Sequence, residues 1–431
     1  MTGIFDKLRK KAKDGYQSPP TLEPYATLGF QDDPFAHKKP AEETIVEIPD
    51  LEPAVERVAG HLSDLRNKKP FFWTEDAYKG HHLLLVGPSG SGRTFLCHLL
   101  QQVLGSLEDP EIPPIKTFYV NAEHEWRPST SPSSEEGIEP YSNFQNWLGE
   151  NEDDVREADI LFCDNAGIVW KMWDHIISEL FKTTYRPLIV SSLSFSEHTW
   201  LETSSDSLQE AREFLECFYP IPHFLRPFSK TDLVVDFLKK RIAHTHPTPN
   251  NEPFEQVALE EIAKLALGLP SLACWLGSEA ILEANKAKRI NVTLEDVEIA
   301  AVRLNFQRAW NILFEEAPKA GPQENILRRA LYYAGEARLS LGSHSMRDYA
   351  QLGFGVTNSD LKNDPIIGKS ASTISYHLKD LSENHQLLRV VQRGKSRIYY
   401  CDRPVLNALE LMLTRQPAVE AELEPEVESE R

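Results

Sequence analysis

A glycine-rich loop, Gly87–Thr94, directly follows the apolar run Leu83–Val86 and has the sequence GPSGSGRT. Its spacing is that of a P-loop, in which a strand ends, the glycines turn the backbone N–H groups inward, and a helix begins. Those amides and the positive end of the helix dipole would surround a polyphosphate. The loop therefore predicts nucleotide binding; a glycine-rich loop without a ligand is the alternative. The expected nucleotide-binding residues are Gly87, Pro88, Ser89, Gly90, Ser91, Gly92, Arg93, Thr94 and Phe95.

The residue at position 93 departs from this pattern, because arginine stands where a P-loop has lysine. A planar guanidinium does not simply replace a compact ammonium beside the β- and γ-phosphates. The loop alone therefore does not decide whether the protein hydrolyses ATP.

A second apolar strand, expected at Ile160–Cys163, leads into Asp164 and Asn165. An acid at the end of such a strand, downstream of a P-loop, is the Walker B arrangement, so we expect Asp164 and Thr94 to hold Mg²⁺. A solvated acid at the strand end is the alternative. Asn165 can orient an attacking water but cannot take its proton. Ser192, after the strand expected at Leu188–Ser191, is a candidate phosphate sensor; Ser191 is another, and ordinary loop serines are the alternative. The expected catalytic residues are Asp164, Asn165 and Ser192.

A basic stretch near the C-terminus contrasts with an acidic chain. Between positions 365 and 403 there are seven Lys and Arg against three Asp and Glu, whereas the whole chain has a formal net charge of -19. Helices are expected over Ile326–Ala334, Met346–Leu352 and Ser370–Glu383. Together with strands expected over Leu387–Gln392 and Ser396–Cys401, they make a helix-turn-helix with a β-hairpin wing. This pattern favours duplex DNA, through phosphates and base edges, over a unit used only for protein contacts. The expected DNA-binding residues are Ser372, Thr373, Tyr376, Lys379, Arg393, Lys395 and Arg397.

The composition is that of a globular protein of two or three domains, with 431 residues, 41% of them hydrophobic. We expect no membrane span and no secretory signal, because no apolar run is long enough. The five cysteines form no C-x-x-C pair, which predicts buried thiols in a reducing cytoplasm. The whole chain is too acidic to coat nucleic acid over its entire surface.

Strand and helix signals alternate through the first half of the chain, which predicts a parallel sheet with helices on both faces. After Pro222 the strand signals fade and helices follow. The expected fold class is α/β: a P-loop parallel-sheet core with a helical lid and a C-terminal winged helix-turn-helix domain. The expected divisions are a flexible arm (1–45), the core (46–222), the lid (223–320), the winged helix (321–413) and an acidic disordered tail (414–431). A polar surface insertion is expected at 125–140. A short amphipathic helix in the arm, with a membrane-surface or partner-binding role, is an alternative to disorder.

The order of P-loop, Walker B strand, serine strand and the segment Phe224–Leu233 leading into helices resembles the AAA+ superfamily. The lid followed by a winged helix resembles its origin-recognition and Cdc6-like initiator clade. The resemblance covers roughly residues 50–410 and implies ATP or ADP with Mg²⁺ as cofactors. The chain departs from the family at Arg93 and Asn165, and at Ser271, which occupies the place of the lid's sensor arginine. All three departures weaken hydrolysis more than binding.

Two functions of different classes are consistent with these sequence features. The first is a nucleotide-gated protein that binds ATP with weak or no hydrolysis and grips duplex DNA, as an initiator-like or mobile-element factor. The alternative is a non-enzymatic scaffold or defence regulator with a degenerate nucleotide pocket. A conventional motor ATPase is disfavoured by Asn165 and Ser271. Double-stranded DNA is the expected partner, together with a second copy of the chain or another protein.

Overall fold

The computed structural model divides the chain into two compact units. Unit 1 comprises Met1–Glu47 and Phe228–Leu304, and unit 2 comprises Ile48–Pro227 and Asn305–Arg431. Ser89, most of the arm 1–45, residues 127–137 of the polar insertion and the tail 414–431 lie outside the described residues. The five divisions expected from the sequence stay a prediction. The structure describes residues 25, 28–30, 33–35, 51–67, 78, 82–88, 90–105, 115–126, 138–182, 187–218, 222–225, 227–228, 230–246, 253–266, 268–303, 322–342, 344–364, 367–403 and 405–411.

Unit 2 is built on a five-stranded sheet whose paired strands all run parallel, in the order β2-β3-β4-β1-β5. The expected α/β class is thereby confirmed. One strand departs from the expected organisation: His223–Phe224 pairs with β1, although we expected the sheet to end before the lid at Pro222. The strands are β1 (Leu83–Gly87), β2 (Thr117–Asn121), β3 (Ile160–Asp164), β4 (Leu188–Ser194) and β5 (His223–Phe224).

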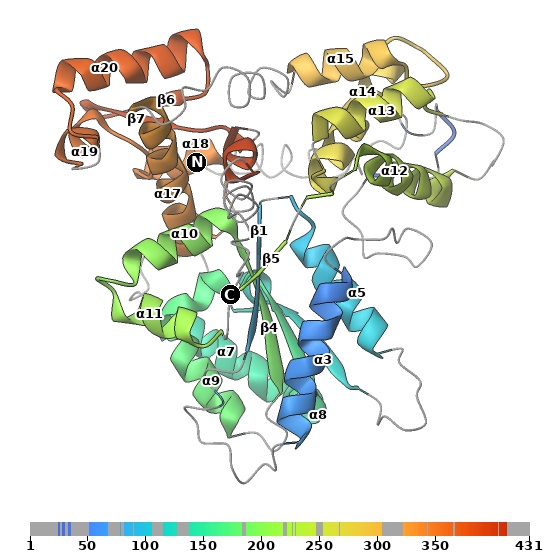
Figure 1. Cartoon of the computed structure of the whole chain (residues 1–431), viewed down its shortest axis with the longest axis vertical. Coiled ribbons are helices and arrows are strands. Elements are labelled where there is room, and N and C mark those ends of the chain that lie inside the picture. The colour runs from blue at the N-terminus through green and yellow to red at the C-terminus, as the bar shows by residue number, and fades with distance from the viewer. Residues whose placement is uncertain are drawn as a thin grey trace, which may run out of the picture. The chain divides into compact units, whose positions relative to one another are not determined.

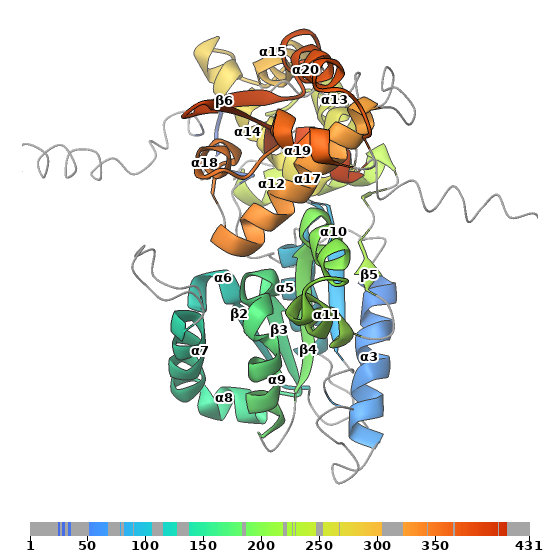
Figure 2. The same cartoon turned by 90° about the vertical axis from the view of Figure 1, so that its left-hand side faces the viewer.

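Helices cover both faces of this sheet, because alternate residues of its buried strands point to opposite sides (Figures 1 and 2). Leu83 and Leu85 of β1 pack with α3 and α5, whereas Leu84 and Val86 join a Trp-rich cluster on the other face. The helices of this part are α3 (Leu51–Asn67), α5 (Arg93–Gly105), α6 (Ala122–Glu125), α7 (Ile138–Glu150), α8 (Glu152–Glu157), the 3-10 helix η3 (Ala166–Met172), α9 (Trp173–Phe181), α10 (Phe195–Ser204) and α11 (Gln209–Glu216).

The C-terminal part of unit 2, called here the helix–hairpin region (322–411), has its own apolar core. Its helices and antiparallel hairpin follow the order expected for a winged helix, with two short additional helices in the described residues, α19 and one at 405–411, that the sequence analysis missed. The elements are α17 (Pro322–Leu341), α18 (Met346–Leu352), α19 (Asn358–Asn363), α20 (Ala371–Lys379), the π-helical turn η5 (Asp380–Asn384), β6 (Arg389–Arg393), β7 (Ser396–Tyr400) and a last helix at 405–411.

Helix α17 lies directly on the start of α10, which follows β4. A Cβ atom added to Gly335 of α17 would lie 2.2 Å from the carbonyl oxygen of Ser196, so only glycine permits this approach. Leu339, one turn further, is buried in the cluster on the sheet's Trp-rich face. The helix–hairpin region is thus packed against the carboxyl-end edge of the sheet.

Unit 1 is helical, and a segment of the N-terminal arm packs within it. Phe35 lies edge-on to Phe254 and so close to Gly277 that a Cβ there would be 2.5 Å from its ring. Leu28, Phe30 and Phe35 are each only 3% exposed, so these residues are packed, whereas most of the arm 1–45 that we expected to be flexible lies outside the described residues. The helices of unit 1 are α12 (Thr231–Thr245), α13 (Gln256–Ala266), α14 (Pro270–Lys286) and α15 (Leu294–Arg303).

Two chain-wide expectations can be compared with the described residues. Within them, no helix is both long and apolar enough to cross a bilayer. All five cysteines are buried thiols with no disulfide in the described part of the chain. Burial raises the pKa of the Cys274 thiol to about 11, which keeps this thiol protonated near neutral pH.

Candidate functional site

The glycine-rich loop joins β1 to α5 in the geometry that its sequence predicts. Gly90 and Gly92 have φ angles of 90° and 89°, in the left-handed region that favours glycine. A Cβ at Gly87 would lie 2.6 Å from Ser91 Oγ, so the loop also needs glycine for space. Helix α5 begins at Arg93, and its first-turn N–H groups lack carbonyl partners within the helix. The loop can therefore present amides to an anion.

Asp164 ends strand β3, which β4 separates from β1 in the sheet, and receives a hydrogen bond from the loop. The Thr94 hydroxyl donates to Asp164 Oδ2 at 2.7 Å, so the structure brings together the two expected metal ligands. Tyr119 donates to the same oxygen at 3.2 Å, and Ser192 donates to Oδ1. Burial raises the pKa of Tyr119 and the Asp164 charge adds to this, so the phenol stays a donor. The Asp164 carboxylate is fully buried and held by three hydroxyls.

This pair fits a magnesium ion that also binds nucleotide oxygens and water. Among the described residues, no group of three or more His, Cys, Asp or Glu side chains is arranged to hold a metal. Mg²⁺ commonly takes one or two protein oxygens and completes its shell with phosphate and water. One hydroxyl and one carboxylate, 2.7 Å apart at the loop, suit that mode.

Asn165 takes the position after Asp164 in a left-handed backbone conformation, with φ 56° and ψ 37°. Asparagine tolerates this conformation better than most residues. Its amide nitrogen Nδ2 donates to Asn121 Oδ1 at 3.5 Å, and its Oδ1 accepts from Arg338 Nη2 at 3.4 Å. The side chain is thus held between β2 and α17 at the carboxyl end of the sheet.

Ser192 is fully buried, although we expected it to be a phosphate sensor. Its hydroxyl donates to Asp164 and accepts from the Asn165 backbone N–H at 3.2 Å, so it positions these two residues. The strand register explains this placement, because Ser192 lies beside Leu85, whereas Ser194 lies beside Gly87 at the start of the loop. These contacts do not bear on phosphate binding, so the role of Ser192 as a phosphate sensor stays a prediction.

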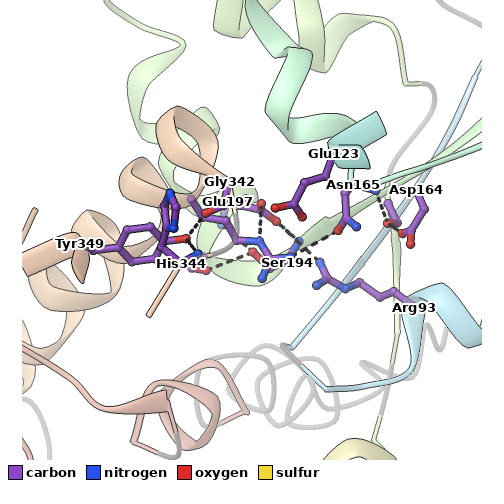
Figure 3. Close-up of polar contacts among 12 residues, drawn as sticks. Arg93, Glu123, Asp164, Asn165, Ser194, Glu197, Gly342, His344 and Tyr349 are labelled. Atoms are coloured by element: carbon purple, nitrogen blue, oxygen red, sulfur yellow. Dashed lines mark hydrogen bonds and ion pairs between the residues drawn. The ribbon is translucent and has the colours of Figure 1, made fainter. Parts of the chain in front are cut away.

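Two charged residues that the sequence analysis missed complete the site. Glu197 Oε2 lies 3.8 Å from Arg93 Nη1, and Figure 3 shows both side chains. Glu197 Oε1 lies 3.0 Å from Arg338 Nε. Glu197 also accepts a hydrogen bond from the Ser194 N–H and forms a capping box at the start of α10. The pattern Ser194-x-x-Glu197 was a readable cap signal, whereas nothing in the sequence places Arg338 here.

The electrostatics of the two arginines differ. Burial lowers the pKa of the Arg93 guanidinium, against the opposing effect of Glu197. The pKa of Arg338 is raised, first by the Glu197 carboxylate and in part by Glu123, which Figure 3 shows beside this cluster. Both side chains remain cations at neutral pH.

The expected DNA-binding residues lie on α20 and on the hairpin of the helix–hairpin region. Ile374 and Leu378 are buried in its core, whereas Tyr376 on the opposite side is 66% exposed. The hydroxyls of Ser372 and Thr373 both lie 2.9 Å from that of Ser370, at the start of α20. The expected basic residues Lys379, Arg393, Lys395 and Arg397 are all exposed.

Two of these basic side chains have contacts within the region. Lys379 pairs with Glu383 at 3.6 Å, and Arg393 lies against Gly353 at the end of α18. Gly353 has a φ of 113°, and a Cβ there would lie 2.1 Å from Arg393 Nη1. Arg393 is therefore placed by α18 as well as by the hairpin.

Comparisons with known proteins give structural likenesses alone. No family model and no curated protein sequence matches the chain. The Aeropyrum pernix ORC1 protein in complex with DNA is 18% identical, with 88% of this chain and 96% of that chain covered and a TM-score of 0.41. The Aeropyrum pernix ORC2 protein in its ADP form is 14% identical, over 91% and 99%, with a TM-score of 0.47. Drosophila ORC bound to DNA is 13% identical, over 94% and 99%, with a TM-score of 0.39.

Proposed function

We propose that this chain binds ATP or ADP with Mg²⁺ at Gly87–Thr94 and grips duplex DNA through the helix–hairpin region, acting as a nucleotide-gated switch that hydrolyses ATP slowly or not at all. An initiator-like or mobile-element role fits this activity. The observation that carries the proposal is the 2.7 Å hydrogen bond between Thr94 and Asp164, at a glycine-rich loop that leads directly into helix α5.

Two unsatisfied donors at the loop support an anionic ligand. Arg93 Nη1 and Ser91 Oγ are buried atoms without a hydrogen-bond partner among the described residues. Burying such groups unsatisfied costs about 1–3 kcal/mol each, and more for a charged group. Phosphate oxygens of a nucleotide would satisfy them, and Mg²⁺ held by Thr94 and Asp164 would neutralise part of the phosphate charge.

Slow hydrolysis follows from the residue beside Asp164. Asn165 has no group that can accept a proton from an attacking water, and its amide is engaged by Asn121 and Arg338. The site can therefore bind and orient a nucleotide and water without a strong general base at this position.

The test is nucleotide binding and phosphate release by the purified chain, with and without duplex DNA. The variants are Arg93→Ala and, as a control, Lys182→Ala, whose exposed side chain pairs with Glu179 one turn away. We expect the wild-type chain to bind ATP with little turnover. Arg93→Ala should weaken binding by about tenfold or more, since a charged hydrogen bond is lost, and Lys182→Ala should match wild type.

The other outcomes identify the alternatives. If the folded wild-type chain binds neither ATP nor ADP, the loop is a relic and the scaffold or defence-regulator hypothesis replaces this one. Fast ATP turnover would mean that our inference of slow hydrolysis from Asn165 is wrong. A thermal melt of each variant separates lost binding from lost folding.

A further inference from the structure

One carboxylate in unit 2 is shared by two arginines that come from distant parts of the sequence. Glu197 lies between Arg93 of the P-loop and Arg338 of α17 in the helix–hairpin region. The carboxylate is 5% exposed and the Arg93 side chain 9%, so both charges are largely removed from water. A buried carboxylate opposite two cations leaves one positive charge uncompensated by Glu197.

The contacts of Glu197 do not use the full hydrogen-bonding capacity of Arg93. At 3.8 Å the pair is an ionic contact that is too long for a hydrogen bond, and Arg93 Nη1 has no hydrogen-bond partner. Glu197 Oε2 is already occupied, because it accepts from the Ser194 N–H at 2.5 Å. An unpartnered guanidinium nitrogen that is nine-tenths buried at the P-loop indicates an anionic ligand there.

Arg338 contacts the same carboxylate from α17. Its Nε binds Glu197, and its Nη2 lies 3.4 Å from Asn165 Oδ1. Asn165 directly follows Asp164, which is bonded to Thr94 of the P-loop. The Arg338 guanidinium therefore lies at the carboxyl ends of β3 and β4, beside the residue that follows the expected metal ligand Asp164.

We propose that Arg338 binds the terminal phosphate of a nucleoside triphosphate, so that a residue of the helix–hairpin region completes the nucleotide site of the same chain. The inference rests on the proposed binding of nucleotide at Gly87–Thr94. A planar guanidinium can exchange a carboxylate oxygen for phosphate oxygens and keep its fork geometry. A diphosphate lacks the group that Arg338 would bind, so Arg338 selects the triphosphate.

The experiment compares the affinities of ADP and of a non-hydrolysable ATP analogue for the full chain at fixed Mg²⁺. Arg338→Gln removes the charge but can keep an amide donor toward Glu197, at the position of the arginine Nε. Arg338→Lys keeps a point charge for phosphate without the fork. Arg328→Ala is the control on the same helix, since Arg328 is half-exposed and pairs with Glu324 one turn away.

We expect Arg338→Gln to weaken binding of the triphosphate analogue by about tenfold and to change ADP binding by less than about twofold. Arg338→Lys should retain part of the selectivity, and Arg328→Ala all of it. An equal loss of affinity for both nucleotides, or no loss for either, would overturn the inference that Arg338 binds the terminal phosphate. Neither result would overturn the proposal that Gly87–Thr94 binds nucleotide. If Arg338→Gln does not fold, the ratio measured for Arg338→Lys decides in the same way. A folded wild-type chain that binds neither nucleotide would overturn the proposed function, and this inference with it.

Discussion

At the scale of single residues, the site is organised by a charge that the sequence motifs do not contain. Glu197 pairs with both Arg93 and Arg338 and compensates one of their two charges, and removing one member of a largely buried ion pair leaves its partners uncompensated. A nucleotide would provide the same negative charge from its phosphates. Stability without ligand and gain of stability with ligand should therefore change in opposite directions when Glu197 loses its charge.

Glu197→Gln tests this exchange, because the glutamine oxygen can keep the capping-box bond from the Ser194 N–H, while the charge and the acceptor toward Arg338 are removed. We expect the free energy of unfolding without nucleotide to fall by about 3 kcal/mol. The rise in melting temperature on adding ATP and Mg²⁺ should exceed that of wild type, as differential scanning fluorimetry would measure. Glu202→Gln is the control, since this carboxylate on the same helix is 60% exposed. Equal ATP-induced shifts in Glu197→Gln and wild type would contradict the exchange.

At the scale of elements, the sheet and most helices follow from local patterns. Buried parallel strands are short apolar runs, so β1, β3 and the start of β4 could be placed, and α18 matches the expected Met346–Leu352. Strand β5 could not be predicted from the sequence, because a strand of two residues is too short to show an alternation of apolar and polar side chains. The helix expected at Ile326–Ala334 continues to Leu341, and these extra turns carry Gly335 and Arg338 onto the core.

The candidate site, like the fold, could be predicted only in part from the sequence. The P-loop and Asp164 follow from spacing, because backbone geometry and metal chemistry restrict the residue types there. Glu197 and Arg338 contribute through tertiary packing of α17 on α10, which local patterns do not encode. Ser192 was assigned from its place after a strand, and only the register shows that it lies below the loop.

The packing of α17 against α10 gives a prediction at this scale. Gly335→Ala places a Cβ 2.2 Å from the Ser196 carbonyl oxygen, so the helix must move away from the core. We expect a loss of stability of about 1–3 kcal/mol from overpacking and weaker selectivity for ATP over ADP, because Arg338 moves with the helix. Gly60→Ala in α3 is the matched control, since its Cβ would meet nothing within 4 Å and alanine favours the helix. Thermal melts and nucleotide titrations measure both effects. Equal stability of the two variants would show that α17 is not held by this contact.

At the scale of the whole molecule, the distribution of charge decides where DNA can bind. A chain with a net charge of -19 repels a polyanion over most of its surface, so attraction must come from a local basic face. The exposed residues Arg393, Lys395 and Arg397 of the hairpin supply one, beside the exposed Tyr376 and Lys379 of α20. Contacts of this kind are made to phosphates, and binding should therefore depend on salt more than on sequence.

The double variant Arg393→Ala/Lys395→Ala tests whether the hairpin makes these contacts. Each lost phosphate contact lowers the salt dependence of log K by about one, so the slope against log salt should fall by about two. Affinity should fall alike for unrelated duplexes, as fluorescence anisotropy at several salt concentrations would measure. Lys116→Ala/Lys182→Ala removes the same charge from two exposed side chains of the core, which pair with Glu157 and Glu179. If both double variants lower the slope equally, general charge rather than the hairpin attracts DNA, and the gripping role assigned to the helix–hairpin region is wrong.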